Sequence, residues 1–224
     1  MKESEKHPVA KGQPLHLQVY EYLKDRILQG KIPCGSKILE SKISEELQVS
    51  RSPVREAIRM LCNDELLVAN GNGIVVNPMS FEDTVEVYEC RIVMESFAAR
   101  LAAARIDKKA LDQLETYIGN VASLHKEHSP ENYTKIIDLN SQFHNLIVLS
   151  SGHKRLRKLI ENNSALAALS RANEFFIFDR NDDYVEEHKS IWEALTRHDG
   201  LLAEEQMRIH IQHDLDFFKK SNLR

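Results

Sequence analysis

The chain has 224 residues, of which 42% are hydrophobic and 29% charged, as expected of a globular protein with a buried core. No apolar stretch has the length of a membrane span or of a signal-peptide core, so we expect a cytoplasmic protein with no membrane partner. Three scattered cysteines without a CxxC pair argue against a disulfide framework and against a thiolate zinc site.

Charge is distributed unevenly along the chain. Residues 1–78 contain 11 Lys and Arg against 10 Asp and Glu, and subtraction from the chain totals of 30 and 34 leaves 19 against 24 for the rest. The net charges of the two parts are then +1 and −5, so only the first part is a candidate for an anionic partner.

Helical periodicity begins after a polar segment, residues 1–12, that we expect to be a flexible tail. Apolar residues recur at three- and four-residue steps over 17–27, which predicts a first helix. A short helix is predicted over about 40–48. A third begins after a brief turn, with Ser52 as its N-cap and Pro53 in its first position, where a missing N–H does no harm.

Two short β-prone runs follow, Leu-Leu-Val-Ala and Gly-Ile-Val-Val, joined across Asn70-Gly71-Asn72. Asn-Gly between such runs is the strongest short-range signal for a hairpin, because both residues tolerate positive φ. Three helices and a hairpin predict a winged helix-turn-helix domain over residues 13–78.

Beyond residue 78 the pattern is helical throughout. Capping residues separate six predicted helices, which span about 81–105, 108–127, 130–150, 153–177, 182–199 and 201–219. Asp107 is the expected N-cap of the second, while Gly152 and Gly200 are expected where helices stop. Short connections predict an antiparallel bundle over residues 79–224, so the predicted fold class is mainly α.

The third helix carries a row of arginines. Arg51, Arg55 and Arg59 follow at four-residue steps, on the side opposite the apolar residues. An arginine fork can bind guanine O6 and N7 together, and the helix N-terminus with Ser52 can hold a phosphate. A solvated charged face would show the same spacing. The surrounding short helix, turn and hairpin favour DNA reading.

A resemblance to the DNA-binding domain of the GntR family of bacterial transcription regulators is carried by GKIPCGSKILESKISEELQVSRSPVREAIRML and the later NGNGIVV. The resemblance implies that Arg51, Ser52 and Arg55 read bases and phosphates. Arg59 would lie beside them, and Gly73 in the wing. It also implies a homodimer on a palindromic operator of double-stranded DNA, since one short helix reads too few bases for specificity.

Three of the ten histidines fall on predicted core-facing stripes of three different helices: His144, His188 and His210. Asn140 lies four residues before His144 and shares its face. Each histidine could simply be buried and hydrogen-bonded to a neighbour. Together, three imidazoles and an amide oxygen could hold Zn²⁺ or Ni²⁺ and leave coordination positions for an outside ligand.

Residues 80–219 resemble the all-helical effector-binding domain called FCD, through LNSQFHNLI, EEHKSIWEAL and MRIHI. The resemblance implies that the metal ligands are Asn140, His144, His188 and His210. The family more often has aspartate at the first of these positions, and asparagine keeps the oxygen donor but removes a negative charge. Glu65 is a second departure, because the family usually has glycine at the end of the recognition helix.

Arg91 lies in line with the inward-facing residues of the first bundle helix, and a buried charge needs a partner. Glu95, one turn later, could pair with it. Alternatively, Arg91 could bind the carboxylate of a small metabolite, which fits the organic-acid effectors of the family.

The sequence as a whole predicts a transcription repressor, not an enzyme, that senses a small organic acid at a metal site. Two rival hypotheses remain: a metal-dependent enzyme that uses the same histidines, and a metal sensor without an organic effector. The chain has no HExxH motif and no pair of ExxH motifs, which argues against the enzyme.

Overall fold

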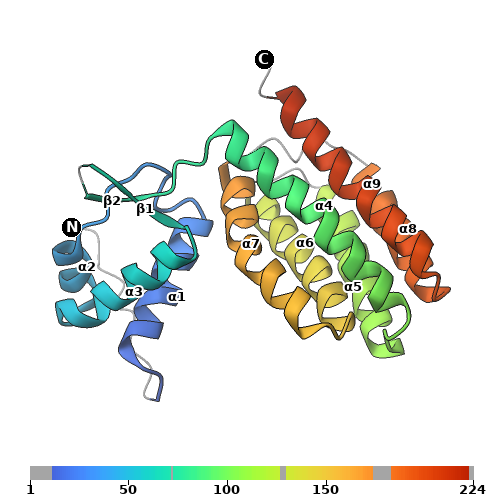
Figure 1. Ribbon diagram of the computed structural model, residues 1–224, viewed down its shortest axis with the longest axis horizontal. Coiled ribbons are helices and arrows are strands. Elements are labelled where there is room, and N and C mark those ends of the chain that lie inside the picture. The colour runs from blue at the N-terminus through green and yellow to red at the C-terminus, as the bar shows by residue number, and fades with distance from the viewer. Residues whose placement is uncertain (1–11, 72, 127–129, 174–182, 222–224) are drawn as a thin grey trace. The chain divides into compact units, whose positions relative to one another are not determined.

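The computed structural model describes residues 12–71, 73–126, 130–173 and 183–221. The chain divides into two compact units, Met1–Ser80 and Phe81–Arg224 (Figure 1). The fold is mainly α, as predicted, with a winged helix-turn-helix followed by a helical bundle. The predicted tail, except Gly12, lies outside the described residues. None of the helices in these ranges is both long and apolar enough to cross a membrane.

The first unit is built from three helices and a hairpin (Figure 1). They are α1 Leu15–Leu28, α2 Glu40–Leu47, α3 Arg51–Asn63, β1 Leu67–Asn70 and β2 Gly73–Val76. α3 packs against α1 and α2 through its apolar face, which includes the fully buried Val54, Ala57 and Leu61. The opposite face, which carries the arginines, is left to solvent.

The prediction of the α3 start is wrong by two residues. The helix begins at Arg51 after Ser50, whose side chain makes no capping hydrogen bond, so Ser52 is the second helical residue and Pro53 the third. The first N–H groups of a helix have no partner within it, so proline is tolerated at any position of the first turn. Proline therefore fixes the turn but not the starting residue.

The strands pair antiparallel, with Leu67 opposite Val76 and Asn70 opposite Gly73, which confirms the hairpin. The loop consists of Gly71 and of residue 72, which lies outside the described residues. A third segment joins the sheet edge: the amide of Ile38 donates to the carbonyl of Ile74 at 2.9 Å. The sequence did not predict this segment, because it is too short to show alternation.

The second unit contains six helices among its described residues. They are α4 Phe81–Ala103, α5 Lys108–His125, α6 Pro130–Ser150, α7 Lys154–Asn173, α8 Asp183–Thr196 and α9 Gly200–Ser221. α4 packs against α6, α7 and α9, so it contacts the helices that carry His144 and His210. Asp107 caps α5 as predicted, accepting a hydrogen bond from the Ala110 amide at 2.8 Å.

One of the two predicted glycine stops is confirmed. Gly152 follows α6 with φ 64°, a conformation that side chains with a Cβ rarely adopt. Gly200 begins α9 instead of ending α8. The reason is that α8 ends earlier, at Thr196, and Asp199 accepts a hydrogen bond from the Leu202 amide at 3.0 Å, which starts the next helix.

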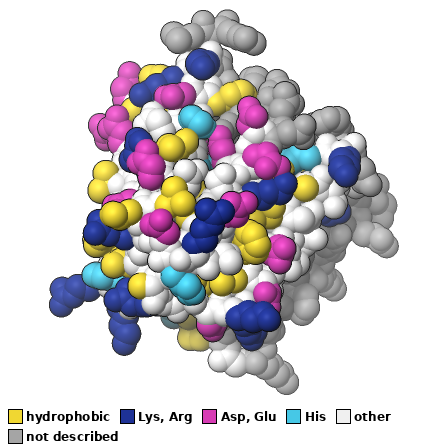
Figure 2. Space-filling view, turned by 90° about the vertical axis from the view of Figure 1, so that its right-hand side faces the viewer, with side chains coloured by type: hydrophobic (Ala, Val, Ile, Leu, Met, Phe, Trp, Pro, Cys, Tyr) yellow, Lys and Arg dark blue, Asp and Glu magenta, His cyan; other side chains and the backbone are white. Residues whose placement is uncertain are grey.

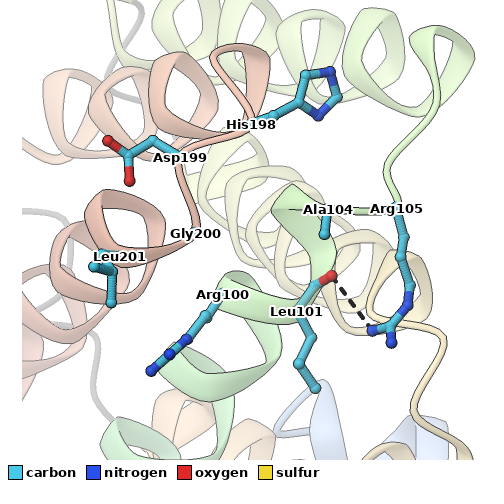
Figure 3. Close-up of a pocket in the computed structure, with 8 residues that line it drawn as sticks. All are labelled: Arg100, Leu101, Ala104, Arg105, His198, Asp199, Gly200 and Leu201. Atoms are coloured by element: carbon cyan, nitrogen blue, oxygen red, sulfur yellow. Dashed lines mark hydrogen bonds between the residues drawn. The ribbon is translucent and has the colours of Figure 1, made fainter.

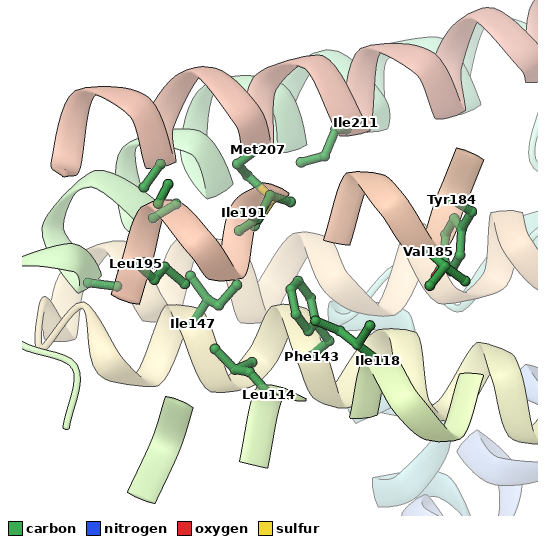
Figure 4. Close-up of a cluster of buried hydrophobic side chains, with 14 of the residues drawn as sticks. Leu114, Ile118, Phe143, Ile147, Tyr184, Val185, Ile191, Leu195, Met207 and Ile211 are labelled. Atoms are coloured by element: carbon green, nitrogen blue, oxygen red, sulfur yellow. The ribbon is translucent and has the colours of Figure 1, made fainter. Parts of the chain in front are cut away.

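An apolar core holds the bundle together (Figure 4). Its buried residues include Leu114 and Ile118 of α5, Phe143 and Ile147 of α6, Ile191 and Leu195 of α8, and Met207 and Ile211 of α9. Burying each aliphatic side chain contributes about 1.5 to 3 kcal/mol. The core therefore fixes α6, α8 and α9, the three helices from which the candidate metal ligands project.

Candidate metal centre and nucleic-acid interface

Three histidines meet inside the helical unit. His144 on α6, His188 on α8 and His210 on α9 are all buried, and one ring nitrogen of each lies within 4.8 Å of the others. Asn140, one turn before His144, is also buried, and its Oδ1 has no hydrogen-bond partner among the described residues. The structure thus brings together the three imidazoles that the sequence analysis selected and leaves an amide oxygen unsatisfied on the same helix face.

Two carboxylates fix the orientation of two rings. Glu95 Oε2 lies 2.7 Å from His144 Nδ1. Glu187 Oε2 lies 2.8 Å from His210 Nδ1. An ionised carboxylate only accepts hydrogen bonds, so each Nδ1 carries a proton, and a neutral ring then has its lone pair on Nε2. The Nε2 atoms of His144 and His210 face each other at 3.2 Å, and two facing lone pairs repel unless a cation lies between them.

The separation of these nitrogens suits a metal ion. Two nitrogens that each lie about 2.0 to 2.1 Å from zinc are roughly 2.8 to 3.0 Å apart at an octahedral angle of 90° and roughly 3.3 to 3.4 Å apart at a tetrahedral angle, which together span about 2.8 to 3.4 Å. The observed 3.2 Å falls within this range. Burial lowers the pKa of His144 to about 4, although Glu95 opposes the shift, so the ring is neutral at neutral pH and available as a ligand. With the unsatisfied Asn140 oxygen, this donor set fits Zn²⁺ or Ni²⁺.

Arg91 is buried and paired with Glu95, the simpler of the two predicted alternatives. Its Nε donates to Glu95 Oε1 at 2.7 Å, while the other oxygen of Glu95 holds His144. Burial by itself would raise the pKa of Glu95, but the charge of Arg91 and the bond from His144 hold it well below its usual range. Arg91 Nη1 is also buried and has no hydrogen-bond partner among the described residues, so one donor remains for a ligand.

Aromatic rings line one side of the cluster. The ring centroids of Phe143 and Tyr184 lie 4.3 and 4.4 Å from that of His188. Apolar walls lower the local dielectric constant and strengthen any ionic contact in the site.

Glu187, which the sequence analysis missed, also lies 2.6 Å from Nδ1 of the exposed His213. Neither partner of Glu187 is recognisable from the local sequence, because both lie on another helix.

A separate pocket of about 660 Å³ lies where α8 turns into α9 (Figure 3). It shares no residue with the histidine cluster, and its basic groups are already engaged. Arg105 Nη1 donates to the Ser151 carbonyl at 2.6 Å, and Arg100 pairs with Glu204 at 3.1 Å.

In Figure 2, acidic and basic side chains are interspersed over the face turned to the viewer, so that face offers no extended surface of one sign of charge.

The predicted DNA-reading residues are exposed on α3. Arg51 and Ser52 lie in its first turn, and the side chains of Arg55 and Arg59 are 63% and 65% exposed. Arg55 Nε lies 2.8 Å from Glu40 Oε2 on α2, so the helix-turn-helix itself orients this fork. α3 thus presents its guanidinium groups on a face that carries none of the core, and α2 contributes Glu40 beside them.

The wing lies against Lys37, a residue of the segment before α2 that the sequence analysis did not select. Gly73 begins β2 with φ 129°, and a Cβ built there would lie 3.3 Å from Lys37 Cε. Lys37 is exposed, so it adds a positive charge beside the hairpin. At the other end of the hairpin, Glu65 has φ 58°, the left-handed conformation that glycine adopts without strain. This explains physically why glycine would suit that position.

Comparison with known proteins identifies both units. Residues 15–76 match the bacterial regulatory proteins of the gntR family, and residues 86–213 match the FCD domain. The chain is also 31% identical over 210 residues, 93% of each protein, to the "Uncharacterized HTH-type transcriptional regulator YdhC" of Bacillus subtilis (strain 168). This chain belongs to the GntR family. Its bundle is an FCD domain, so the resemblance seen in the sequence is confirmed.

Other members of the family support the same assignment. A gluconate operon transcriptional repressor of Bacillus licheniformis is 28% identical over 182 residues, covering 75% of this chain and 73% of the repressor. Among solved structures, E. coli McbR/YncC superposes with a TM-score of 0.79 at 22% identity, covering 94% of this chain and 99% of that one. At that identity the similarity shows the fold alone.

Proposed function

We propose that this GntR regulator is a cytoplasmic, homodimeric repressor in which residues 13–78 bind a palindromic operator and residues 79–224 sense a small carboxylate at a metal ion. The observation that carries the sensing part is the pair of facing Nε2 atoms of His144 and His210, 3.2 Å apart. His188 and the unsatisfied oxygen of Asn140 complete the donor set.

The DNA-binding part of the proposal is supported by the exposed face of α3. Arg55 would release Glu40 and bind the major-groove edge of a guanine instead. Arg51 and Ser52 at the start of the helix would bind the phosphate backbone of the DNA. Arg59, at the next turn, would extend the positive face, and Gly73 lets the hairpin approach the duplex closely. Two copies of this short reading surface would give the specificity that one lacks.

In the bundle, Asn140, His144, His188 and His210 would hold Zn²⁺ or Ni²⁺. When bound, the ion supplies a concentrated positive charge that can accept a carboxylate oxygen. The protein's own contribution is orientation: Glu95 and Glu187 hold two rings in the ligating tautomer. Arg91 Nη1 would provide a second, directional contact for the same carboxylate.

The proposal is tested with full-length protein stripped by a chelator and reloaded with Zn²⁺ or Ni²⁺. A panel of small carboxylic acids is screened by thermal shift, and operator release is measured by gel shift on DNA selected from a random pool. We expect stoichiometric metal, together with acids that stabilise only the loaded protein and release the DNA. Turnover of an acid would indicate the enzyme instead, and DNA release by metal alone would indicate a metal sensor.

His188→Ala isolates the role of the cluster. Losing one imidazole should abolish stoichiometric metal binding and lower the melting temperature of the loaded protein, because bound metal stabilises the folded state. His16→Ala, in the other unit, is the control and should keep its metal. Equal metal content in His188→Ala and wild type after dialysis would reduce His188 to a core residue.

A further inference from the structure

The edge of the wing carries a lysine whose backbone is held in place by β2. Lys37 pairs with Val75 of β2 in an antiparallel bridge. The next amide along the chain, that of Ile38, donates to the Ile74 carbonyl at 2.9 Å. Lys37 is exposed while Ile38 is buried, as the alternation of side chains along a strand requires. The side chain of Lys37 therefore projects from the solvent side of the wing.

This side chain extends toward the hairpin loop. Gly73, the first residue of β2, lies two residues before Val75 and so shares its face of the sheet. A Cβ built on Gly73 would lie 3.3 Å from Lys37 Cε and 3.9 Å from Lys37 Nζ. Glycine thus leaves the space that the end of the lysine fills. The ammonium group is consequently placed at the start of β2, next to the loop.

The charge of Lys37 is not balanced by a neighbouring carboxylate. Among the residues that the structure describes, its side chain forms no hydrogen bond or ion pair. By contrast, Arg55 and Arg59 of α3 are each paired with a glutamate, so the formal charge of each pair is zero. An unpaired cation attracts a polyanion more strongly than a neutral pair does. Lysine suits this role because its ammonium group binds phosphate as a compact point charge.

The lysine lies close to the residues that would read the bases. Glu40, whose Oε2 lies 2.8 Å from Arg55 Nε, follows Lys37 in the chain after two intervening residues. Such a segment spans at most about 10 to 11 Å when it is fully extended. Phosphates of one DNA strand follow at about 3.4 Å along the helix axis, so this span corresponds to about three phosphates. A duplex whose bases contact Arg55 would therefore bring phosphates close to Lys37.

We propose that Lys37 binds a DNA phosphate beside the base pairs that α3 reads and thereby fixes the wing on the duplex. This rests on the proposed function, because it presupposes that the first unit binds DNA. Arg55 would supply the preference for one sequence. Lys37 would supply affinity for any duplex, since every sequence carries the same phosphates. Gly73 would contribute indirectly, because it leaves room for the lysine side chain.

The test is the salt dependence of DNA binding by the full-length protein. Fluorescence anisotropy measures its affinity for an operator selected from a random pool and for a random duplex, from about 50 to 200 mM KCl. Lys37→Gln removes the charge and keeps a side chain of similar length. Each lost phosphate contact should make the slope of log affinity against log salt shallower by about 0.9. Because this contribution vanishes at 1 M salt, binding at 0.1 M should be about 8-fold weaker per half-site, for operator and random DNA alike.

Two control variants separate a local contact from a change in net charge. Lys37→Arg keeps the charge and should keep the wild-type slope. Lys158→Gln removes a lysine of α7 that is likewise exposed and forms no ion pair within the described ranges, and it should also keep that slope. The melting temperature of Lys37→Gln should equal that of wild type, because the exposed side chain makes no bond that folding would lose.

A Lys37→Gln slope equal to that of wild type would overturn the inference, even where Arg55→Ala lowers the operator preference and shows that α3 reads bases. An equal change of slope in Lys158→Gln would assign the effect to net charge and overturn it as well. Weaker binding of the operator alone, with an unchanged slope, would make Lys37 a base reader and contradict the phosphate contact. Wild-type protein that binds neither duplex would overturn the proposed DNA binding and this inference together.

Discussion

Asn140→Asp probes the charge of the metal site most directly. Asn140 is buried, and its Oδ1 has no hydrogen-bond partner among the described residues, so the substitution puts a carboxylate where it gains no existing partner. In metal-free protein an uncompensated buried charge destabilises by about 3 to 5 kcal/mol, less if the group takes up a proton. In metal-loaded protein the ion compensates the charge. The substitution should therefore destabilise the metal-free form more than the loaded form.

The magnitude follows from linkage. Replacing a neutral oxygen ligand with an anionic one should tighten zinc binding about 10- to 100-fold, the range typical of changes around metal ligands. That corresponds to about 1.4 to 2.7 kcal/mol of additional stabilisation by saturating metal. For a chain of this size, about 2 to 4 °C per kcal/mol makes the zinc-induced rise in melting temperature roughly 3 to 11 °C larger than in wild type. A carboxylate effector should bind more weakly, because the ion presents one unit less positive charge.

Chelator competition measures the zinc affinity. Thermal unfolding with and without zinc measures the zinc-induced rise in melting temperature. Asn145→Asp adds the same charge to the exposed face of the same helix and serves as the control. It should leave both quantities as they are in wild type. If Asn140→Asp binds zinc no more tightly than wild type, position 140 lies outside the coordination sphere and the four-ligand hypothesis fails.

Two further substitutions test the other sites. Arg55→Ala should lower the ratio of operator binding to random-DNA binding roughly 5- to 150-fold per half-site, measured by gel shift at fixed salt. The melting temperature should not change, because the side chain is exposed. An unchanged binding ratio would show that Arg55 does not read bases. Arg91→Ala should lower the free energy of unfolding by about 3 to 5 kcal/mol in a denaturant titration, because it leaves Glu95 buried without its ion pair. It should also weaken zinc binding, since Glu95 orients His144; an effect on the carboxylate effector alone would contradict that role.

The helices could be predicted from the sequence because their signals are local. Within the described residues, periodic apolar residues and the Asp107 cap placed the bundle helices close to their observed ends, and Asn-Gly placed the hairpin. The helix ends predicted at 127 and 177 and the start predicted at 182 lie outside those residues. The errors arose where one signal fits several positions. Proline is compatible with any residue of a first turn, so it did not fix the start of α3. The segment at Ile38 pairs with β2 through backbone hydrogen bonds. Such bonds do not depend on side-chain type, and the segment is too short to show an alternation of apolar and polar residues.

The metal site could be predicted only in part. Helix faces and family resemblance selected the three histidines and Asn140, since each lies on an inward stripe of its own helix. Their supporting carboxylates could not be found in the same way. Glu95 is 49 residues from His144, and Glu187 is 23 residues from His210, so both contacts exist only after the helices have packed. Arg91 and Glu95 are the exception, because an i, i+4 pair on one helix is visible in the sequence.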